Sequence, residues 1–414
     1  MNVTGIIMEC NPFHEGHAYL LREARRRTEA EYIVVAMSGD YVQRGEPAVY
    51  DKYIRAEQIL RGGADLVLEI PLYAACGGAD YFARGGVGLL QQLGVVTDLC
   101  FGSESADLDY LRQSAEKLDE LSSGTGVSRK KFLSGLREGL SYPAARAAAL
   151  PGLPSSPNDL LAVEYCRALT HRETSGQAAS PIAPHALPRI DVPSATQHRK
   201  ELLQTRNSVI WQSPDRSDLP AAAGDAQVPL FPIGPDDFSD ALLYALRMQE
   251  SSLSGFADIS GDLADRIRRV LPQYTGFSSF CDLLKTRNMT RTRISRCLLH
   301  ILLQMKQSTL DSLSDSGMVL YARPLAINRG AAPLLSAIRR KARIPFLAKL
   351  SAAPSLLPPD SLSCLNEEIR AEELYTLVLQ NVWNRTCGGR TAASSGKNGG
   401  SIPRAARRKL PLRE

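Results

Sequence analysis

The sequence contains no long hydrophobic segment. No window of about 18 consecutive apolar residues occurs in its 414 residues, so a membrane-spanning helix is not expected. The opening MNVTGIIMECNPF has no basic stretch followed by a long apolar one, so a secretory signal peptide is not expected either. We therefore predict a cytoplasmic protein that does not associate with membranes.

The cysteines are few and show no metal-binding or disulfide pattern. No two of the eight form a CxxC pair, which argues against a zinc ribbon and against a small disulfide-rich domain. We interpret most of them as reduced core residues. They are Cys10, Cys76, Cys100, Cys166, Cys281, Cys297, Cys364 and Cys387.

The chain as a whole has no large excess of charge of one sign. Its net charge of +5 is too small to indicate nucleic-acid binding by itself. Acidic residues are absent, however, between Asp282 and Asp311, where six side chains are basic. Such a local positive field is typical of a surface that meets phosphate groups. The six are Lys285, Arg287, Arg291, Arg293, Arg296 and Lys306.

Short β-branched runs alternate with helical patterns over the first hundred residues. The runs are VTGIIM, YIVVAM, ADLVLEI and VTDLCFG, and helical patterns at 17–27, 53–61 and 82–93 separate them. This alternation predicts a Rossmann-like α/β domain, with a parallel sheet covered by helices on both faces. Ligands bind at the carboxyl ends of the strands in such sheets. The loops expected to line one crevice are 9–17, 38–46, 69–79 and 102–104.

The spacing of apolar residues changes along the chain and indicates a second, mainly α-helical domain. We predict a nucleotide-binding catalytic domain over residues 1–203 and a linker rich in Pro, Asp and Ser over 204–237. Residues 238–384 have helical apolar spacing and form the predicted C-terminal domain. Residues 385–414 are basic, rich in Gly and Ser and poor in apolar residues, so we expect a disordered tail.

The segment from Glu9 to His17 is the most informative motif. It lies between the first predicted strand and the first predicted helix, and it ends in His14-Glu15-Gly16-His17. Two imidazoles at such a turn lie beside the positive end of the helix, where a nucleotide phosphate can bind. Their N–H groups can donate to the charge that develops on phosphate oxygens during nucleotidyl transfer. Gly16 lets the backbone approach closely.

Helix capping and metal binding are the alternative roles for His14 and His17. Two histidines without a nearby third ligand make a poor zinc site, and the chain has only six histidines. We therefore favour the nucleotide interpretation, predict His14 and His17 as the catalytic residues, and predict no metal site made by protein side chains.

The His14-to-His17 string resembles the HxGH signature of the nucleotidyltransferase superfamily, which includes class I aminoacyl-tRNA synthetases and small adenylyltransferases. A longer series of segments, in order over most of residues 1–385, resembles the bacterial tRNA(Met) cytidine acetate ligase family. The segments are GIIMECNPFHEGHAYLL, VAMSGDYVQRGEPAVYDKYIRAE, GADLVLEIPLYAACGGADYFARGGVGLL, LCFGSE, SPNDLLAVEY, SATQHRKEL and KTRNMTRTRISRCLLHILL.

The resemblance implies a reaction and its substrates. Members of the family convert acetate and ATP to acetyl-adenylate and transfer the acetyl group to the N4 amine of the wobble cytidine of elongator tRNA(Met), without acetyl-CoA. Mg²⁺ is expected because it pairs with nucleotide phosphates. Acetate and elongator tRNA(Met) are thus the expected partners, and DNA is not.

The resemblance also implies which residues bind ATP. The segment SATQHR resembles the family's SATxIR element, the counterpart of a loop that holds the outer phosphates in related transferases. The alternatives are a turn glycine at Gly102, a helix cap at Asn158 or Ser194, and a solvated side chain at Arg189. The implied residues are Ile7, Met8, Glu9, Cys10, Asn11, Pro12, Phe13, His14, Glu15, Gly16, His17, Ala18, Tyr19, Leu20, Gly102, Asn158, Arg189, Ser194, Thr196 and Arg199.

The chain departs from the family pattern near that element. Only four residues separate Arg189 from Ser194, without the family's usual stretch of glycine, tyrosine, histidine and aspartate. His198 stands where the family usually has an apolar residue, and Asp40 stands where it has an asparagine. These departures bear directly on the geometry of the nucleotide site.

The basic run KTRNMTRTRISR begins a predicted amphipathic helix whose N-terminal part faces RNA. Its cations and threonine hydroxyls together suit phosphates and riboses. A solvated helix face is the usual explanation of a charge run, but the lack of acidic neighbours and the resemblance favour RNA binding. The predicted RNA-binding residues are Lys285, Arg287, Arg291, Arg293 and Arg296.

Several assignments stay open. Residues 321–328 either extend the RNA surface or form a buried strand, and the basic tail either attracts RNA nonspecifically or is solvated. Asp40 and Glu104 lie on the predicted crevice loops. Each could serve as a general base or as a structural cap, and the sequence favours neither role. The alternative functions are a small-molecule adenylyltransferase and an RNA-binding protein with a decayed nucleotide site.

Overall fold

A computed structural model describes residues 1–123, 126–140, 142–174, 181–206, 231–391 and 412–413. Its centre is a seven-stranded sheet. In spatial order the strands are β7 (Ala183–Pro188), β6 (Asp98–Ser103), β1 (Val3–Met8), β2 (Tyr32–Ser38), β5 (Leu66–Ile70), β8 (Arg323–Asn328) and β9 (Leu412–Arg413). The first five run parallel, whereas β8 is antiparallel to β5.

The central strands are buried on both faces. Every residue of β1 and of β5 is buried. Continuous burial is typical of parallel strands covered by helices on both sides, and it explains why their sequences do not alternate between apolar and polar residues.

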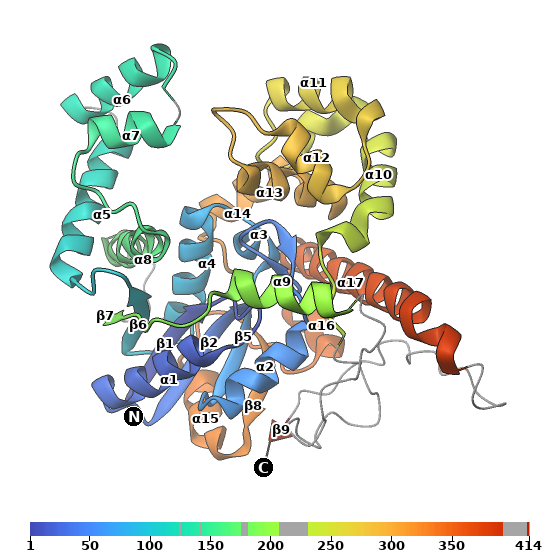
Figure 1. Cartoon of the computed structure of the whole chain (residues 1–414). Coiled ribbons are helices and arrows are strands. Elements are labelled where there is room, and N and C mark those ends of the chain that lie inside the picture. The colour runs from blue at the N-terminus through green and yellow to red at the C-terminus, as the bar shows by residue number, and fades with distance from the viewer. Residues whose placement is uncertain (124–125, 141, 175–180, 207–230, 392–411, 414) are drawn as a thin grey trace.

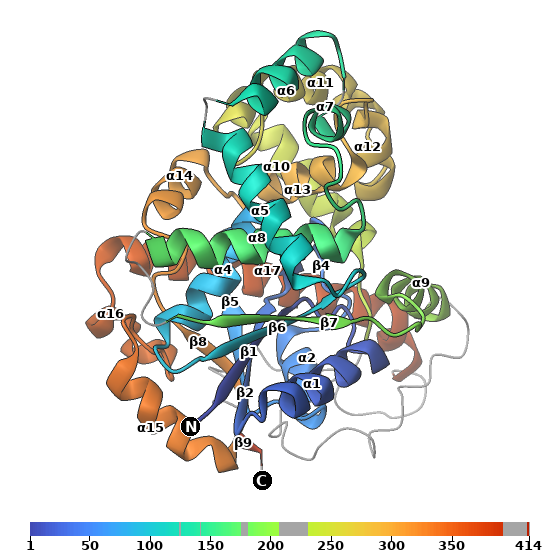
Figure 2. The same cartoon turned by 90° about the vertical axis from the view of Figure 1, so that its left-hand side faces the viewer.

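Helices cover both faces of the sheet (Figures 1 and 2). On one face α1 (Glu15–Thr28) and α2 (Lys52–Arg61) pack through Leu21 and Ile59. On the other face α4 (Ala79–Gln92) and α8 (Pro157–Thr174) belong to a larger core.

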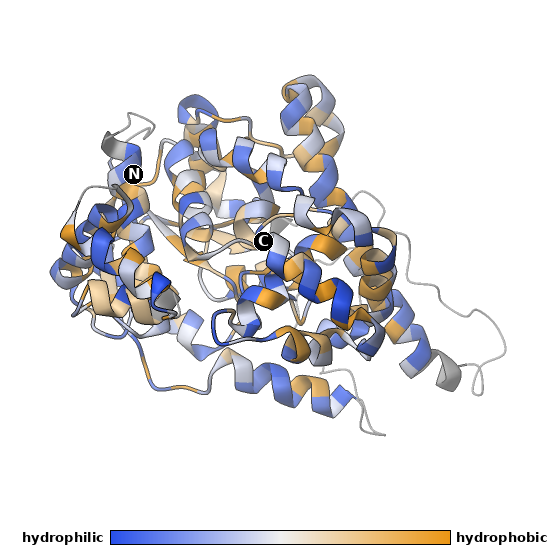
Figure 3. Cartoon of the chain, turned by 90° about the horizontal axis from the view of Figure 1, so that it is seen from above, coloured by the Kyte–Doolittle hydropathy of each residue, from blue (hydrophilic) through white to orange (hydrophobic). Residues whose placement is uncertain are grey.

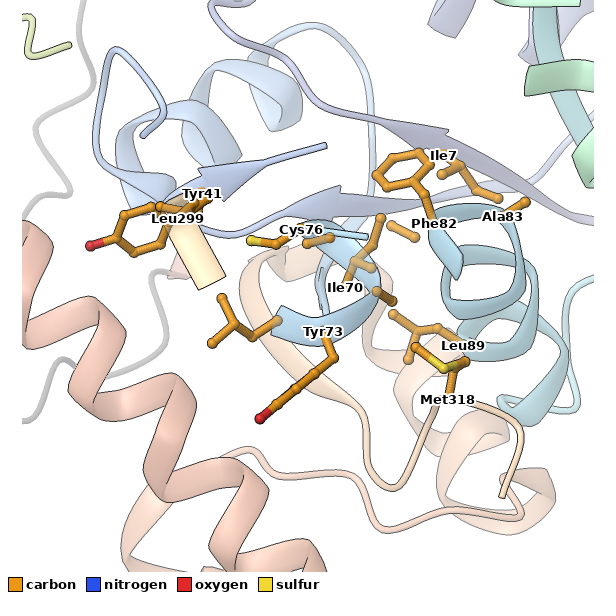
Figure 4. Close-up of a cluster of buried hydrophobic side chains, with 14 of the residues drawn as sticks. Ile7, Tyr41, Ile70, Tyr73, Cys76, Phe82, Ala83, Leu89, Leu299 and Met318 are labelled. Atoms are coloured by element: carbon orange, nitrogen blue, oxygen red, sulfur yellow. The ribbon is translucent and has the colours of Figure 1, made fainter. Parts of the chain in front are cut away.

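The larger core also includes side chains from the C-terminal part of the chain. Figure 4 shows Leu299 and Met318 in the same cluster as Ile7, Ile70 and Phe82. The C-terminal helices therefore share a core with the sheet.

Two groups of helices stand above the sheet in Figure 1. The first contains α5 (Leu108–Ser123), α6 (Val127–Arg137) and α7 (Tyr142–Ala149). The second contains α10 (Ser239–Met248), α11 (Gly261–Val270), α12 (Phe277–Leu284), α13 (Arg291–Leu302) and α14 (Gln307–Asp315). The remaining elements include α3 (Leu72–Ala75), α9 (Ala195–Arg206), α15 (Ala332–Lys341), α16 (Ala353–Leu356), α17 (Pro359–Thr391) and the hairpin of β3 (Tyr41–Val42) and β4 (Glu46–Pro47).

Hydrophilic and hydrophobic residues share the surfaces of most helices (Figure 3). This mixture fits amphipathic helices that bury one side against a core. Over the ranges that the structure describes, no helix combines the length and the apolar character that crossing a bilayer demands.

The structure confirms the predicted fold class, a mostly parallel sheet with helices followed by a largely helical region. It also shows how the two parts of the chain are connected. β8 completes the sheet begun by the N-terminal part, and Tyr41 and Leu72 form hydrogen bonds with residues of α17. The predicted division into residues 1–203 and 238–384 therefore separates segments that pack together.

The structure bears on two further sequence assignments, residues 321–328 and the start of the C-terminal tail. Residues 321–327 are buried and β8 begins at Arg323, so this segment is the buried strand of the two alternatives. The helix α17 runs to Thr391, so the predicted start of the disordered tail at residue 385 falls inside a helix. Residues 207–230 of the predicted linker, and 392–411 and 414 of the tail, lie outside the described residues.

Candidate active site

The two histidines of the HxGH motif form the beginning of α1. His14 is the N-cap, with extended backbone, and its Nδ1 accepts a hydrogen bond from the backbone N–H of Gly16 at 3.0 Å. The Nδ1 of His17 accepts a hydrogen bond from the backbone N–H of His14 at 3.3 Å. The ring centroids of the two histidines are 3.9 Å apart. This reciprocal arrangement is a capping box built from imidazoles.

The capping bonds determine which nitrogen of each ring can serve a ligand. An imidazole nitrogen that accepts a hydrogen bond carries no proton, so the neutral tautomer of His14 and of His17 has its proton on Nε2. Each ring therefore keeps one N–H donor that the helix cap does not use. Capping and phosphate binding are compatible roles for the same side chain.

Both histidines are held in the neutral form. Burial, together with the neighbouring His14 and Arg189, lowers the pKa of His17 to about 3. Burial also lowers the pKa of His14, with added contributions from His198 and Arg189. Near neutral pH the pair acts as oriented N–H dipoles at a helix N-terminus and not as two imidazolium ions.

The loop before α1 is fixed by a buried arginine from α2. The guanidinium of Arg55 donates to the backbone carbonyls of Glu9 at 2.7 Å and Ser38 at 3.2 Å, and also to the carbonyl of Gly39. Its side chain is fully buried. Arg55 thus connects the loops that follow β1 and β2, two neighbouring parallel strands.

The SATxIR-like element lies against the HxGH loop. Arg199, on α9, donates from Nη1 to the backbone carbonyl of Asn11 at 2.7 Å and from Nη2 to the hydroxyl of Thr196 at 3.2 Å. Ser194 caps α9, because its hydroxyl accepts from the backbone N–H of Gln197 at 3.3 Å. Two segments almost 190 residues apart in sequence therefore meet at one place.

A second group of predicted residues gathers at the carboxyl ends of β6 and β7. The carboxylate of Glu104 accepts from the Asn158 side chain at 2.6 Å and lies 3.4 Å from the Arg189 guanidinium. At Gly102, a Cβ atom would make an ordinary van der Waals contact with the Arg189 side chain, at 3.6 Å, and would meet no other atom within 4 Å. Because α8 begins at Pro157, Asn158 lies inside the helix and is not its N-cap.

Glu104 and Asp40, the two acidic residues of the crevice loops, both have structural partners. Burial raises the pKa of Glu104, but hydrogen bonds from Asn158 and Asp159 outweigh it and lower the pKa overall. Asp40 is buried and accepts from the backbone N–H of Lys52 at 2.8 Å. Neither carboxylate is placed as a free general base.

Some predicted nucleotide-loop residues have side chains in the core. Ile7, Met8 and Cys10 are buried in the clusters on the two faces of the sheet. Burial raises the pKa of the Cys10 thiol well above its usual range, which keeps it protonated. These residues can offer a ligand their backbone but not their side chains.

The predicted RNA-binding arginines differ in their surroundings. Lys285, Arg287 and Arg293 are exposed. Arg291 forms ion pairs with Asp282 at 3.0 Å and Glu46 at 3.7 Å. The assumption that this run has no acidic partners is therefore wrong for Arg291, because Glu46 comes from a hairpin distant in sequence.

Arg296 is the other engaged member of this group. It lies 3.4 Å from the backbone carbonyl of Gln43 and burial lowers its pKa. Three of the five predicted residues are thus open to solvent, and two pack against the β3–β4 hairpin.

Sequence reasoning did not identify His198 as a site residue. Its ring stacks on that of His14, with centroids 6.0 Å apart, and its charge lowers the pKa of His14. The sequence marks His198 only as a histidine where the family usually has an apolar residue. Its contact with His14 depends on the packing of α9 beside α1.

A buried ionic cluster next to the crevice was also missed. The Lys52 ammonium lies 2.7 Å from Glu69, 3.0 Å from Glu372 and 3.7 Å from Asp40. Arg323, from β8, bonds to Glu69 and Glu372 as well. The charges come from residues 40–69, from β8 and from α17, so no local motif reveals them.

No candidate metal centre is found in the part of the chain that the structure describes. No group of three or more His, Cys, Asp or Glu side chains there is arranged to hold an ion.

Comparison with known proteins gives consistent matches over nearly the whole chain. The family model described as HIGH Nucleotidyl Transferase matches residues 1–388. The tRNA(Met) cytidine acetate ligase of Acetivibrio thermocellus is 35% identical, over 94% of this chain and 98% of that protein. The protein of the same name from Bacillus subtilis is 30% identical, over 92% of this chain and 93% of that protein.

Solved structures match as well. Thermotoga maritima TmcAL bound with alpha-thio ATP has a TM-score of 0.78 and 29% identity, and the match covers 92% of this chain and 95% of that one. The apo form of the same protein has a TM-score of 0.82 and 28% identity, with 100% and 99% of the two chains covered.

Proposed function

The chain belongs to the tRNA(Met) cytidine acetate ligase family of HIGH nucleotidyltransferases, and on that basis we propose that it uses ATP to join acetate to the wobble cytidine of elongator tRNA(Met). An acetate oxygen attacks the α-phosphorus of ATP, and pyrophosphate leaves. The N4 amine of the cytidine then attacks the acyl carbon, AMP leaves, and the amine loses a proton. We place this reaction in the cytoplasm, where tRNA is found.

The observation that carries the proposal is the hydrogen bonding of the two histidines. His14 and His17 are neutral, and their Nδ1 atoms are committed to the helix cap. Their Nε2–H groups and the N-terminus of α1 can then stabilise charge that builds up on the α-phosphate oxygens in the transition state. Donors that are already oriented cost little reorganisation during the reaction.

The outer phosphates are assigned to the start of α9. Arg199 supplies a cation beside the HxGH loop, and Thr196 and Ser194 supply hydroxyls. Ionic hydrogen bonds from a guanidinium are well suited to phosphate. Gly102, Asn158 and Arg189 are assigned to the other end of the nucleotide, where Glu104 contacts both Asn158 and Arg189. Mg²⁺, bound to the phosphates, would supply further charge neutralisation.

The tRNA is assigned to the face of α13 and the segment before it. Lys285, Arg287 and Arg293 are exposed there and can pair with phosphates. We propose the catalytic role for residues 1–203 and the tRNA-binding role for residues 238–384, although the two regions pack together.

The test is incorporation of radiolabelled acetate into an unmodified tRNA(Met) transcript with ATP and Mg²⁺, measured together with AMP release. We expect label only when all components are present, and none in a transcript whose wobble cytidine is replaced by uridine. His17→Ala should abolish both signals. His171→Ala, at an exposed histidine on α8, is the matched control and should leave both unchanged.

Two outcomes would contradict the proposal. Acetate-independent transfer of AMP to a small phosphorylated acceptor would indicate a small-molecule adenylyltransferase. Binding of tRNA(Met) without any ATP turnover would indicate an RNA-binding protein with a decayed nucleotide site.

The RNA face has its own measurement. Replacing Lys285, Arg287 or Arg293 by Ala should weaken tRNA binding and flatten the plot of log affinity against log salt by roughly 0.7–0.9 for each phosphate that no longer has its cation. Arg339→Ala, at an exposed position on α15, should change neither quantity. Equal effects at all four positions would argue against a defined RNA face.

A further inference from the structure

The β3–β4 hairpin lies between the HxGH loop and α13. On one side, the backbone N–H of Gln43 donates to the carboxylate of Glu9 at 2.8 Å. On the other side, the hydroxyl of Ser295 on α13 donates to the backbone carbonyl of Gly45 at 2.8 Å. The tip of the hairpin is therefore held from both directions.

Gly45 makes this close packing possible. Its φ is +78°, in the left-handed region, and a Cβ atom at this position would lie 2.3 Å from the backbone nitrogen of Arg296. Only glycine fits both the backbone angle and the contact. The residue before it, Arg44, consequently has a well-determined backbone position.

Arg44 is an exposed cation at the tip of the hairpin. Among the residues that the structure describes, it has no hydrogen-bonding or ion-pair partner, although Gln43 and Gly45 on either side of it are both bonded. Its charge nevertheless acts on Glu9 and on Arg199, the residue that contacts the HxGH loop. Burial raises the pKa of Glu9 and Arg44 opposes that rise, while burial and Arg44 both lower the pKa of Arg199.

With ATP at the HxGH loop and tRNA on α13, the proposed reaction requires an acetate site between these two elements. The carboxylate of acetate must reach the α-phosphate at the HxGH loop, and its carbon must afterwards be open to the cytidine amine, which approaches from α13. The acyl group therefore lies between these two elements. Two anions, acetate and the α-phosphate, must also come together there, which is unfavourable without a nearby cation.

We propose that Arg44 binds the carboxylate of the acyl substrate. A guanidinium presents paired N–H donors whose spacing matches the two oxygens of a carboxylate, so it both neutralises and orients the acid. One carboxylate oxygen then forms the bond to the α-phosphorus as the bond to pyrophosphate breaks. Arg44 remains as a donor to the acyl oxygen until AMP leaves. This assignment rests on the proposed function.

The test compares Arg44→Ala and Arg44→Lys with the unsubstituted enzyme in the ATP-, acetate- and tRNA-dependent formation of AMP. Loss of an ionic hydrogen bond should raise the KM for acetate in Arg44→Ala by roughly tenfold to a hundredfold. The KM values for ATP and tRNA should change by less than about twofold, which is within the usual effect of a surface substitution. Arg44→Lys, which keeps the charge but not the paired donors, should be intermediate.

Chemical rescue and a matched control sharpen the result. Added guanidinium ion should partly restore the acetate KM of Arg44→Ala. Arg26→Ala, at an exposed arginine on α1, should match the unsubstituted enzyme in all three KM values. Thermal melting of each variant reports whether it is folded.

Different failures are distinguishable. An unchanged acetate KM in Arg44→Ala overturns the assignment and leaves the proposed function intact. A raised KM for ATP alone would make Arg44 a phosphate ligand, and a raised KM for tRNA alone would make it an RNA-binding residue, and either result overturns the assignment. If the unsubstituted enzyme forms no AMP in response to acetate, both the proposed function and this assignment fail.

Discussion

The ammonium of Lys52 lies 2.7 Å from the carboxylate of Glu69, and both side chains are buried beside the crevice. Glu372 and Arg323 bring charges from α17 and β8 to the same place. The cluster therefore connects the C-terminal part of the chain to the sheet that holds the nucleotide loop.

Lys52→Met should destabilise the fold strongly. The substitution keeps the length of the apolar stem but removes one of the two cations of the cluster, so that Arg323 alone faces Glu69 and Glu372. Removal of one partner from a buried ion pair typically costs about 3–5 kcal/mol, because an uncompensated charge stays buried. Chemical denaturation would measure the loss. Arg26→Ala, which breaks the exposed pair with Glu23, should leave the midpoint essentially unchanged.

Asp40→Asn should alter the pH dependence of stability. Burial raises the pKa of Asp40 from 3.8 to about 7. The folded protein then holds a proton at Asp40 that the unfolded chain has already released, so this stabilising contribution is complete below about pH 4 and is lost as pH rises towards 7. Asparagine does not ionise.

The melting temperature of Asp40→Asn, relative to that of the unsubstituted protein, should therefore increase between pH 5 and pH 8. Glu368, whose pKa is also raised to about 7, is present in both proteins and cancels in the comparison. A difference that is constant with pH, or that decreases, would show that Asp40 is ionised throughout.

Local sequence patterns predicted the parallel strands and the HxGH turn because those features depend on neighbours in the chain. The β-branched runs and the caps are short-range signals, and β1, β2, β5 and β6 lie where those runs are. No local pattern identifies the strand with which β8 pairs. Its sequence RPLAIN follows several helices, and its partner β5 lies over 250 residues earlier. The position of a strand that joins the sheet from a distant segment is determined by tertiary packing, not by local sequence.

The candidate site divides in the same way. His14 and His17 are recognisable from spacing, and family resemblance identified Arg199, which the structure brings to the carbonyl of Asn11. The stacking of His198 on His14 depends on how α9 packs against α1. The position of Arg44 depends on how α13 packs against the β3–β4 hairpin. Contacts of this kind join distant segments, so no local sequence pattern predicts them.

Gly45→Ala tests the docking of α13 against the hairpin. The added methyl group meets both an unfavourable positive φ and the backbone of Arg296. Gly63→Ala is the matched control, since Gly63 also has a positive φ but a Cβ there has no neighbour within 4 Å. Both should lose stability, by about 1 kcal/mol from the backbone alone.

Gly45→Ala should lose more than Gly63→Ala in urea denaturation, and it alone should raise the KM for tRNA, because α13 must shift. Equal losses with unchanged tRNA kinetics would mean that the hairpin and α13 can separate without consequence for RNA binding.

His14→Ser separates the capping role of His14 from its catalytic role. Serine is among the best N-cap residues, so its hydroxyl can replace Nδ1 as the acceptor for the first turn of α1, and the melting temperature should be maintained. Serine cannot, however, replace the Nε2–H group of His14 as a donor to the α-phosphate. Loss of one such preorganised donor costs roughly 10²–10³ in kcat. The rate of acetate-dependent AMP formation should therefore fall by that factor while the fold stays intact. His14→Ala, which lacks both functions, should lose stability as well as rate, and a fully active His14→Ser enzyme would leave capping as the only role of this histidine.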